Sequence, residues 1–191
     1  MQKQIDIVDK YNRPTGRRLS INEAMKEGAW HRGARVVICT TTGYVLVQKR
    51  SPAMVTDPGY LEFSVGGFVD AGEAPEQTAI REVREELGLN LGHDDLDFAG
   101  VFRLRRQWPA LHKKGRTFSY VYIAVLPSHE IDLTLQPEEV TSAEFISTHQ
   151  LASLIRRHRI KSLGRLEPTY RYYRAILSAA ERRMRASRKL S

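Results

Sequence analysis

The sequence predicts an α+β domain in which a mixed β-sheet packs against helices. Apolar runs of strand length outnumber the helical patterns. The two kinds of pattern also do not alternate regularly along the chain, which argues against a wholly parallel sheet. A chain of 191 residues with 41% apolar residues is long enough to bury a core in one domain with appendages.

Residues 1–32 are expected to form a hairpin and a short helix that belong to this domain. Gln4–Val8 alternates like a strand, and residues 12–16 have the composition of the turn that follows it. Residues 20–28 begin with the serine and glutamate spacing of a capping box and end on glycine, which predicts a short helix.

Residues 33–155 hold most of the strand patterns. Strands are expected at residues 35–40, 44–49, 61–65, 98–104, 117–126 and 140–146. The glycines at 66–67 are expected to end the strand at residues 61–65. Residues 105–116 are expected to form a basic loop. Helices are expected near residues 74–87, 148–157 and 169–188; the first has a proline near its start and a glycine after its end.

The composition excludes several classes of protein. A single cysteine, Cys39, excludes a disulfide framework and an all-cysteine metal site. No apolar run is long enough for a membrane span, and the N-terminal residues lack the apolar core of a signal peptide. We therefore expect a cytoplasmic protein without a membrane partner.

The positive charge is concentrated in residues 156–191, a basic helical tail. The net charge of the chain is +8, of which the tail carries +10 and the rest −2. A solvated helical face explains such a tail, and weak, salt-sensitive binding of nucleic acid is the alternative. An apolar stripe formed by Tyr170, Tyr173, Ile176 and Leu177 predicts docking on the domain or on the second subunit of a homodimer.

Three glutamates share one surface of the helix predicted at residues 74–87. Glu82 and Glu86 are four residues apart, and Glu85 lies one turn from Glu82. Like charges at such spacing destabilise a helix by about 0.2–0.5 kcal/mol per pair. A solvated acidic face is one reading, but Mg²⁺ prefers carboxylate oxygens and would relieve the repulsion.

The spacing around these glutamates is that of a known motif. Its fixed positions are Gly67, Glu73, Arg81, Glu82, Val83, Glu85, Glu86, Gly88 and Leu89. This segment resembles the Nudix box without departure, so the chain resembles the Nudix hydrolases. The resemblance implies an α/β/α sandwich and hydrolysis of a nucleoside diphosphate linked to another group.

The resemblance also implies roles for individual residues. Glu82 and Glu86 correspond to the principal metal ligands, and Glu85 to a further ligand or a catalytic group that positions water. The carbonyl oxygen of Gly66 corresponds to another ligand. Glu73 and Arg81 correspond to the salt-bridged brace of the motif, together with Gly67 and Gly88. The implied cofactor is Mg²⁺, with Mn²⁺ as a substitute.

Hydrolysis also needs a general base and groups that hold the substrate. The base is a glutamate of the motif or an acid outside it, and our candidate is Glu139, with Glu138 as its alternative. Arg50 and Arg105 are candidates for binding the phosphates of a small-molecule diphosphate. The aromatic Trp108, near Arg105, is a candidate for stacking a base. A surface cation or a solvated loop explains these residues equally well.

The N-terminal half resembles a narrower group, the isopentenyl-diphosphate isomerases and their hydrolase relatives. The matching residues are Val8-Asp9, Pro14-Thr15-Gly16, Trp30-His31-Arg32, Leu46–Ser51 and Pro58-Gly59. The isomerases need a cysteine and a histidine where this chain has Gly66 and Phe68, and a glutamate that aligns with Tyr120. With those groups missing and the Nudix box intact, hydrolysis is favoured over isomerisation. His31 is interpreted as a structural or substrate-contact residue, and Cys39 as part of the core.

Three functional hypotheses remain. The first is a Mg²⁺-dependent pyrophosphohydrolase, the second an isoprenoid-diphosphate isomerase, and the third a Nudix protein that binds nucleic acid without catalysis. The intact set of glutamates disfavours the third, because a protein that only binds does not need these mutually repelling charges.

Overall fold

The computed structural model describes residues 3–156 and 167–187. In chain order its elements are β1 (Gln4–Val8), β2 (Pro14–Ser20), α1 (Ile21–Glu27), β3 (Trp30–Thr40), β4 (Tyr44–Arg50), β5 (Leu61–Phe63), β6 (Val65–Phe68), α2 (Pro75–Leu87), η1 (His93–Asp95), β7 (Asp97–Trp108), η2 (Pro109–Leu111), β8 (Lys113–Leu126), β9 (Val140–Ser147), α3 (Thr148–Arg156) and α4 (Glu167–Ser187).

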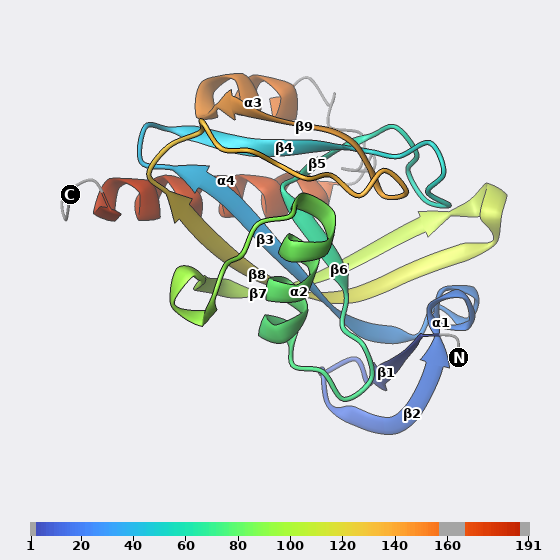
Figure 1. Ribbon diagram of the computed structural model, residues 1–191. Coiled ribbons are helices and arrows are strands. Elements are labelled where there is room, and N and C mark those ends of the chain that lie inside the picture. The colour runs from blue at the N-terminus through green and yellow to red at the C-terminus, as the bar shows by residue number, and fades with distance from the viewer. Residues whose placement is uncertain (1–2, 157–166, 188–191) are drawn as a thin grey trace.

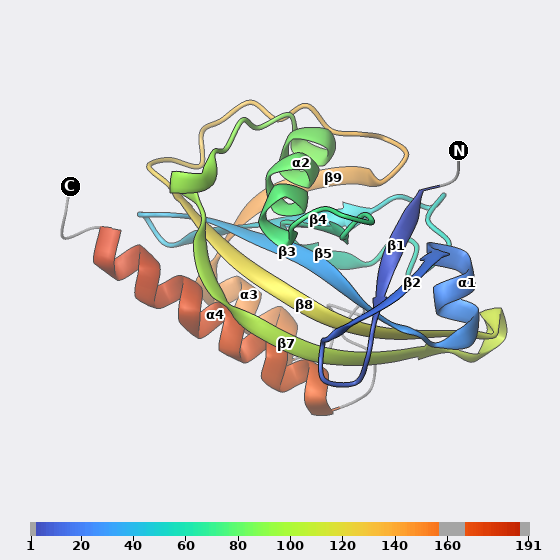
Figure 2. The same cartoon turned by 90° about the horizontal axis from the view of Figure 1, so that it is seen from below.

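The strands of the described residues form one mixed sheet of nine strands. Its central strand β3 pairs in parallel with β8, and the other strand pairs are antiparallel. Helix α2 packs on one face of the sheet, while α3 and α4 pack on the opposite face (Figures 1 and 2). The predicted α+β class and the α/β/α sandwich are therefore confirmed.

The N-terminal hairpin is present, but its turn lies earlier than predicted. Residues 9–13 make the turn, and Pro14 already begins β2, which pairs with β1 from Val8↔Pro14 to Gln4↔Ser20. Strand β2 was not recognisable from apolar alternation because its outer residues are exposed. The predicted helix is α1, and both hydrogen bonds of its capping box are present between Ser20 and Glu23.

Two segments that were not predicted as strands, residues 66–67 and most of residues 105–116, belong to strands of the sheet. Gly66 and Gly67 belong to β6, which pairs with β3 through Arg35↔Gly66 and Ala34↔Gly67, and the interruption falls at Ser64 instead. The expected basic loop at residues 105–116 is the end of the β7–β8 hairpin, with only η2 at its tip. Pairing between the two strands supplies the order that the local sequence does not reveal.

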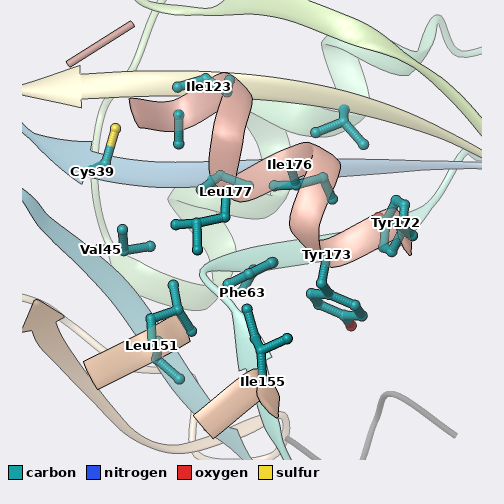
Figure 3. Packing of buried hydrophobic residues seen from close by; sticks show 14 of the residues in the cluster. Cys39, Val45, Phe63, Ile123, Leu151, Ile155, Tyr172, Tyr173, Ile176 and Leu177 are labelled. Atoms are coloured by element: carbon teal, nitrogen blue, oxygen red, sulfur yellow. The ribbon is translucent and has the colours of Figure 1, made fainter. Parts of the chain in front are cut away.

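The core forms two layers, one on each face of the sheet. The layer under α2 contains Val36, Ile38 and Val83, and the opposite layer contains Phe63 and residues of α3 and α4. Figure 3 shows Tyr173, Ile176 and Leu177 of α4 facing this second layer. The predicted apolar stripe therefore docks on the chain's own domain, and the side chain of Tyr170 lies outside the described residues.

None of the helices within residues 3–156 and 167–187 combines the length and apolar character needed to cross a bilayer.

Candidate active site

Helix α2 brings the three glutamates of the motif to one edge of the sheet. The helix begins at Pro75 and ends before Gly88, whose φ of 70° is left-handed and whose N–H donates to the carbonyl of Arg84 at 3.0 Å. Val83 and Leu87 are fully buried against the sheet, and Ile80 is half-buried. The same docking buries Glu82 and Glu86, while the side chain of Glu85 remains 40% exposed.

Arg81 connects the loop before α2 with the glutamates on the helix. Its guanidinium makes two hydrogen bonds of 3.1 Å to the carboxylate of Glu73. A third nitrogen, Nη1, donates to Glu82 at 2.7 Å and to Glu85 at 3.0 Å. The pair of Glu73 and Arg81 is therefore in contact, and it neutralises part of the negative charge of the helix.

Glu82 lies directly against the glycine that begins the motif. A Cβ atom at Gly67 would lie 2.2 Å from Oε1 of Glu82, so a larger residue could not occupy this position without moving the carboxylate. Burial raises the pKa of Glu82, although the charge of Arg81 opposes the shift. The carboxylate is thus confined between β6 and Arg81.

Glu86 is the most buried carboxylate of the three. It is 2% exposed, and its Oε2 accepts a hydrogen bond of 2.8 Å from the side-chain amide of Gln48 on β4. Burial raises the pKa of Glu86 to about 8, against this hydrogen bond and with the help of the charges on Glu82 and Glu139. Among the described residues, neither Oε1 of Glu86 nor Oε1 of Gln48 has a hydrogen-bond partner.

The chemistry of these donors suits a hard divalent cation. Within residues 3–156 and 167–187, no three carboxylate, histidine or cysteine side chains already converge as a complete ligand group, since Arg81 holds Glu82 and Glu85. Glu86 is different, because it combines an unpaired buried oxygen with a pKa raised by burial. A cation beside this carboxylate would bind the unpaired oxygen and favour the charged form of the carboxylate, so the residues fit Mg²⁺ or Mn²⁺.

Glu139 lies near the same carboxylates, and its neighbour Glu138 is exposed. Glu139 is half-buried, and its charge contributes to the raised pKa of both Glu82 and Glu86. Its carbonyl accepts a hydrogen bond of 2.8 Å from the backbone N–H of Ser51, which fixes this segment beside the end of β4. The structure therefore brings Glu139, the first candidate base, to the site.

A cleft adjoins this carboxylate cluster through β6. Gly66 and Gly67 contribute to its lining, as do the charged side chains of Arg35, Arg50 and Glu62. Arg35 and Glu62 also act electrostatically on Glu86, so the cleft and the glutamates of α2 belong to one region. Aromatic and small polar side chains also line the cleft, and the apolar side chains of Met25 and Leu104 contribute to it; the aromatic and polar ones are Phe68, Trp108, Thr117, Ser119, Tyr172 and Tyr173.

The arginines of the cleft are held by a buried carboxylate. The side chain of Glu62 is 4% exposed and pairs with Arg50 at 3.2 Å and with Arg35 at 3.7 Å. Although burial opposes it, the attraction of these guanidiniums keeps the pKa of Glu62 below its ordinary value. Arg50, a predicted phosphate-binding residue, therefore lines the cleft in a fixed position and also donates to the carbonyl of Thr56.

The structure does not place Arg105 in this cleft. Arg105 is exposed, and its guanidinium lies 5.5 Å from the centre of the Trp30 ring. The next residue, Arg106, faces the cleft because successive side chains of a strand point to opposite faces. Arg106 forms an ion pair with Asp57, whose carboxylate also accepts a hydrogen bond from the indole of Trp108.

His31 lines the cleft with a buried ring, whereas Cys39 lies in the core. Nδ1 of His31 lies 3.0 Å from the carbonyl of Ala29, so it carries the proton, and the hydroxyl of Thr117 donates to Nε2 at 3.0 Å. Burial lowers the pKa of His31 to about 4, so the ring is neutral. Cys39 is fully buried, and burial raises the pKa of its thiol to about 12, which agrees with the predicted core position.

Sequence reasoning missed several polar residues of the site. Gln48, Arg35 and Glu62 interrupt apolar strand patterns, and this interruption was the available signal. Their importance depends on which face of the sheet they occupy, which only the strand pairing decides.

Comparison with known proteins identifies the class to which this fold and site belong. Residues 29–165 match the NUDIX domain model. An uncharacterized Nudix hydrolase of Pseudomonas aeruginosa is 32% identical over 139 residues, which cover 73% of this chain and 75% of the relative. Another uncharacterized Nudix hydrolase, from Listeria monocytogenes, is 30% identical over 149 residues, covering 78% and 82%.

A solved structure shows the same fold. The crystal structure of a Deinococcus radiodurans protein aligns with a TM-score of 0.63 at 21% identity, covering 82% of this chain and 91% of that one. The chain belongs to the Nudix hydrolase family, whose members act on phosphoric anhydrides.

Proposed function

We propose that this protein is a Mg²⁺-dependent pyrophosphohydrolase that cleaves a nucleoside diphosphate linked to another group. The observation that carries the proposal is Glu86, a buried carboxylate with an unpaired oxygen and a raised pKa, beside a cleft lined by arginines. Carboxylate oxygens recruit the cation, and guanidinium groups bind phosphate. Mn²⁺ is the expected substitute.

The metal site in this proposal consists of Glu82 and Glu86, with Glu85 and the carbonyl of Gly66 as further ligands. When bound, the cation supplies neutralisation of the diphosphate charge. Glu139 accepts the proton of the water that attacks phosphorus, the bridging P–O bond breaks, and the leaving phosphate keeps the bond's electron pair. Glu85 is the alternative base, because it lies on the same helix surface and remains partly exposed.

The cleft is the proposed site for the rest of the substrate. Arg50 and Arg106 are aimed at it by Glu62 and Asp57, which reduces the entropy that their side chains lose on binding an anion. Arg106 therefore replaces Arg105 as the phosphate-binding candidate on β7.

Membership of the isopentenyl-diphosphate-isomerase-like group is a narrower proposal, based on the N-terminal residues and His31. Hydrolysis is favoured over isomerisation within that group. Gly66 and Phe68, which stand where the isomerases need a cysteine and a histidine, line the cleft without offering a thiol or an imidazole. Cys39 is buried in the core and cannot replace that thiol.

The test is a screen of diphosphate compounds with Mg²⁺ or Mn²⁺ in ¹⁸O-labelled water, read by mass spectrometry. Hydrolysis places one label on a phosphate product, whereas isomerisation leaves the mass of the substrate unchanged. We expect Glu86→Gln and Glu139→Gln to lose most of the activity, and the matched variant Glu138→Gln to retain it. Unlabelled isomer, or full turnover by Glu86→Gln, would contradict the proposal.

Two predictions from the sequence concern partners other than the substrate. A homodimer and weak, salt-sensitive binding of nucleic acid through the basic tail stay predictions. Arg182 and Arg183 are exposed on α4 and are the positions at which charge reversal would test nucleic-acid binding.

A further inference from the structure

Helix α4 reaches the cleft although it lies beyond the part of the chain that matches the Nudix domain. The match ends at residue 165, and α4 begins at Glu167. Tyr172 and Tyr173 of this helix line the cleft together with Arg35 and Glu62. The helix is anchored by Ile176 and further apolar residues in the core layer shown in Figure 3.

The two tyrosines are fixed by their neighbours. The hydroxyl of Tyr172 lies 3.1 Å from Oγ of Ser119, and its ring meets that of Phe102 edge-on at 5.0 Å. The ring of Tyr173 lies 4.7 Å from the ring of Phe63. Burial raises the pKa of Tyr172 to about 12, so this hydroxyl is neutral near pH 7 and can donate or accept. Fixed rings of this kind lose little entropy when they bind a ligand.

The charged side chains in the cleft limit what these rings can bind, although Met25, Leu104 and Phe68 add apolar surface to its lining. A long apolar chain would remove water from Arg35 and Glu62 without giving them hydrogen bonds, which is costly for charged groups. A flat ring with polar edges avoids this cost, because it can lie against aromatic side chains such as Trp108 and Tyr173 while its edge bonds to polar ones.

We propose that α4 is a wall of the substrate cleft, and that Tyr172 and Tyr173 select a diphosphate whose non-phosphate end is a flat, hydrogen-bonding ring of the nucleobase class. This proposal rests on the proposed hydrolysis, but it adds a specificity element outside the Nudix domain match. It also gives the basic tail a function in its own chain.

The experiment compares ADP-ribose with isopentenyl diphosphate as substrates of four full-length proteins. These are the wild type, Tyr173→Leu, Tyr172→Phe and the control Ile176→Val, which changes the same core without lining the cleft. For Tyr173→Leu we expect kcat/KM on ADP-ribose to fall about tenfold, mainly through KM, because a stacking face is lost. Turnover of isopentenyl diphosphate should not fall, and Ile176→Val should behave as the wild type.

A binding measurement separates this proposal from the proposed hydrolysis. ADP-ribose is titrated calorimetrically into each metal-free protein, after circular dichroism has shown native folding. Failure of the wild type to cleave either compound would count against the proposed hydrolysis. In that case, tenfold weaker binding of ADP-ribose by Tyr173→Leu would still support the role of α4. Preference of the wild type for isopentenyl diphosphate, or equal effects of Tyr173→Leu and Ile176→Val, would overturn it.

A different observation supports a second inference, about Gln48. This side chain is 2% exposed, and its amide N–H donates to Oε2 of Glu86 at 2.8 Å. The other oxygens of both groups have no partner among the described residues, although leaving a buried polar group unpaired destabilises the folded state. We infer that Gln48 is a positioning residue, which fixes the carboxylate of Glu86 for the divalent cation that satisfies its free oxygen.

The test is the affinity for Mg²⁺ or Mn²⁺, measured by calorimetry in the absence of substrate. Gln48→Met has nearly the same length but no amide, and we expect its affinity to be about 10–100-fold weaker. The control Leu46→Val changes a fully buried residue two positions earlier on β4 and should bind the metal normally. Unchanged affinity in Gln48→Met, or an equal loss in Leu46→Val, would overturn the inference.

Discussion

In the absence of metal, Glu86→Gln is expected to make the protein more stable above about pH 6, although the same substitution is expected to abolish activity. Folding raises the pKa of Glu86 from 4.5 to about 8, because the residue is only 2% exposed and three other acids, Glu82, Glu139 and Glu62, repel its charged form. The native state therefore keeps a proton that the unfolded chain has already lost. As pH rises from 4.5 to 8, proton loss favours the unfolded state, and the native protein loses stability.

The size of the effect follows from the shift. A pH of 7 lies about 2.5 units above the pKa of this carboxyl in the unfolded chain. At 1.36 kcal/mol per unit, the native state of the wild type loses about 3 kcal/mol of stability. At pH 5 the loss is under about 1 kcal/mol. Total stabilities are about 5–15 kcal/mol, so a change of this size is measurable. Glutamine has no proton to lose and keeps the hydrogen bond from Gln48, so the variant escapes the penalty.

The assay is urea denaturation of the wild type and Glu86→Gln in EDTA between pH 5 and 8. The control is Glu85→Gln, on the same helix but 40% exposed, for which a surface ion pair predicts a change of at most about 1 kcal/mol. Mg²⁺ at 100 times its Kd should then stabilise the wild type by about 2.7 kcal/mol and leave Glu86→Gln unchanged. The reasoning is refuted if Glu86→Gln is less stable than the wild type at pH 8, or if their difference does not depend on pH.

Three further predictions concern positions around the site. Gly67→Ala should lower activity more than about tenfold with unchanged circular dichroism, because its Cβ would lie 2.2 Å from Oε1 of Glu82. Gly88→Ala should lower the free energy of unfolding in urea by roughly 1–3 kcal/mol, because the glycine has a φ of 70° and its new Cβ would lie 2.7 Å from that of Thr134. The buried thiol of Cys39, with a pKa raised to about 12, should react with iodoacetamide only after unfolding, as mass spectrometry would show, and Cys39→Ala should retain turnover.

Local patterns in the sequence were sufficient to predict helix α2 and its acidic surface. Pro75, Gly88 and the apolar spacing are properties of the helix itself, and they do not depend on distant partners. Arg105 shows the limit of such patterns. The sequence does not reveal that β7 extends to Trp108, and this extension decides that Arg106, not its neighbour, faces the cleft.

The long-range contacts of the site were less accessible to sequence reasoning. Gln48 contacts Glu86, and Glu62 contacts the arginines of the cleft. Both contacts depend on the register in which β4 pairs with β5. The apolar stripe of α4 predicted docking, but the position of Tyr172 and Tyr173 beside the cleft depends on packing against β3 and β8. Contacts between residues far apart in the sequence thus decide which side chains line the cleft, while the motif decides which carboxylates lie on α2.

The arrangement of charges on α2 leads to a last prediction about metal binding. Arg81 reaches Glu73, Glu82 and Glu85 but makes no contact with Glu86, and the nearby Arg84 is exposed. Because burial raises the pKa of Glu86 to about 8, we expect its carboxyl to hold a proton near neutral pH until a cation approaches. Because metal ligands must be deprotonated, binding of Mg²⁺ at pH 7 should release close to one proton, and affinity should increase with pH up to about 8. Calorimetry in buffers with different enthalpies of ionisation measures this release; near-zero release by the wild type, or equal release by Glu86→Gln, would show that another group is the ligand.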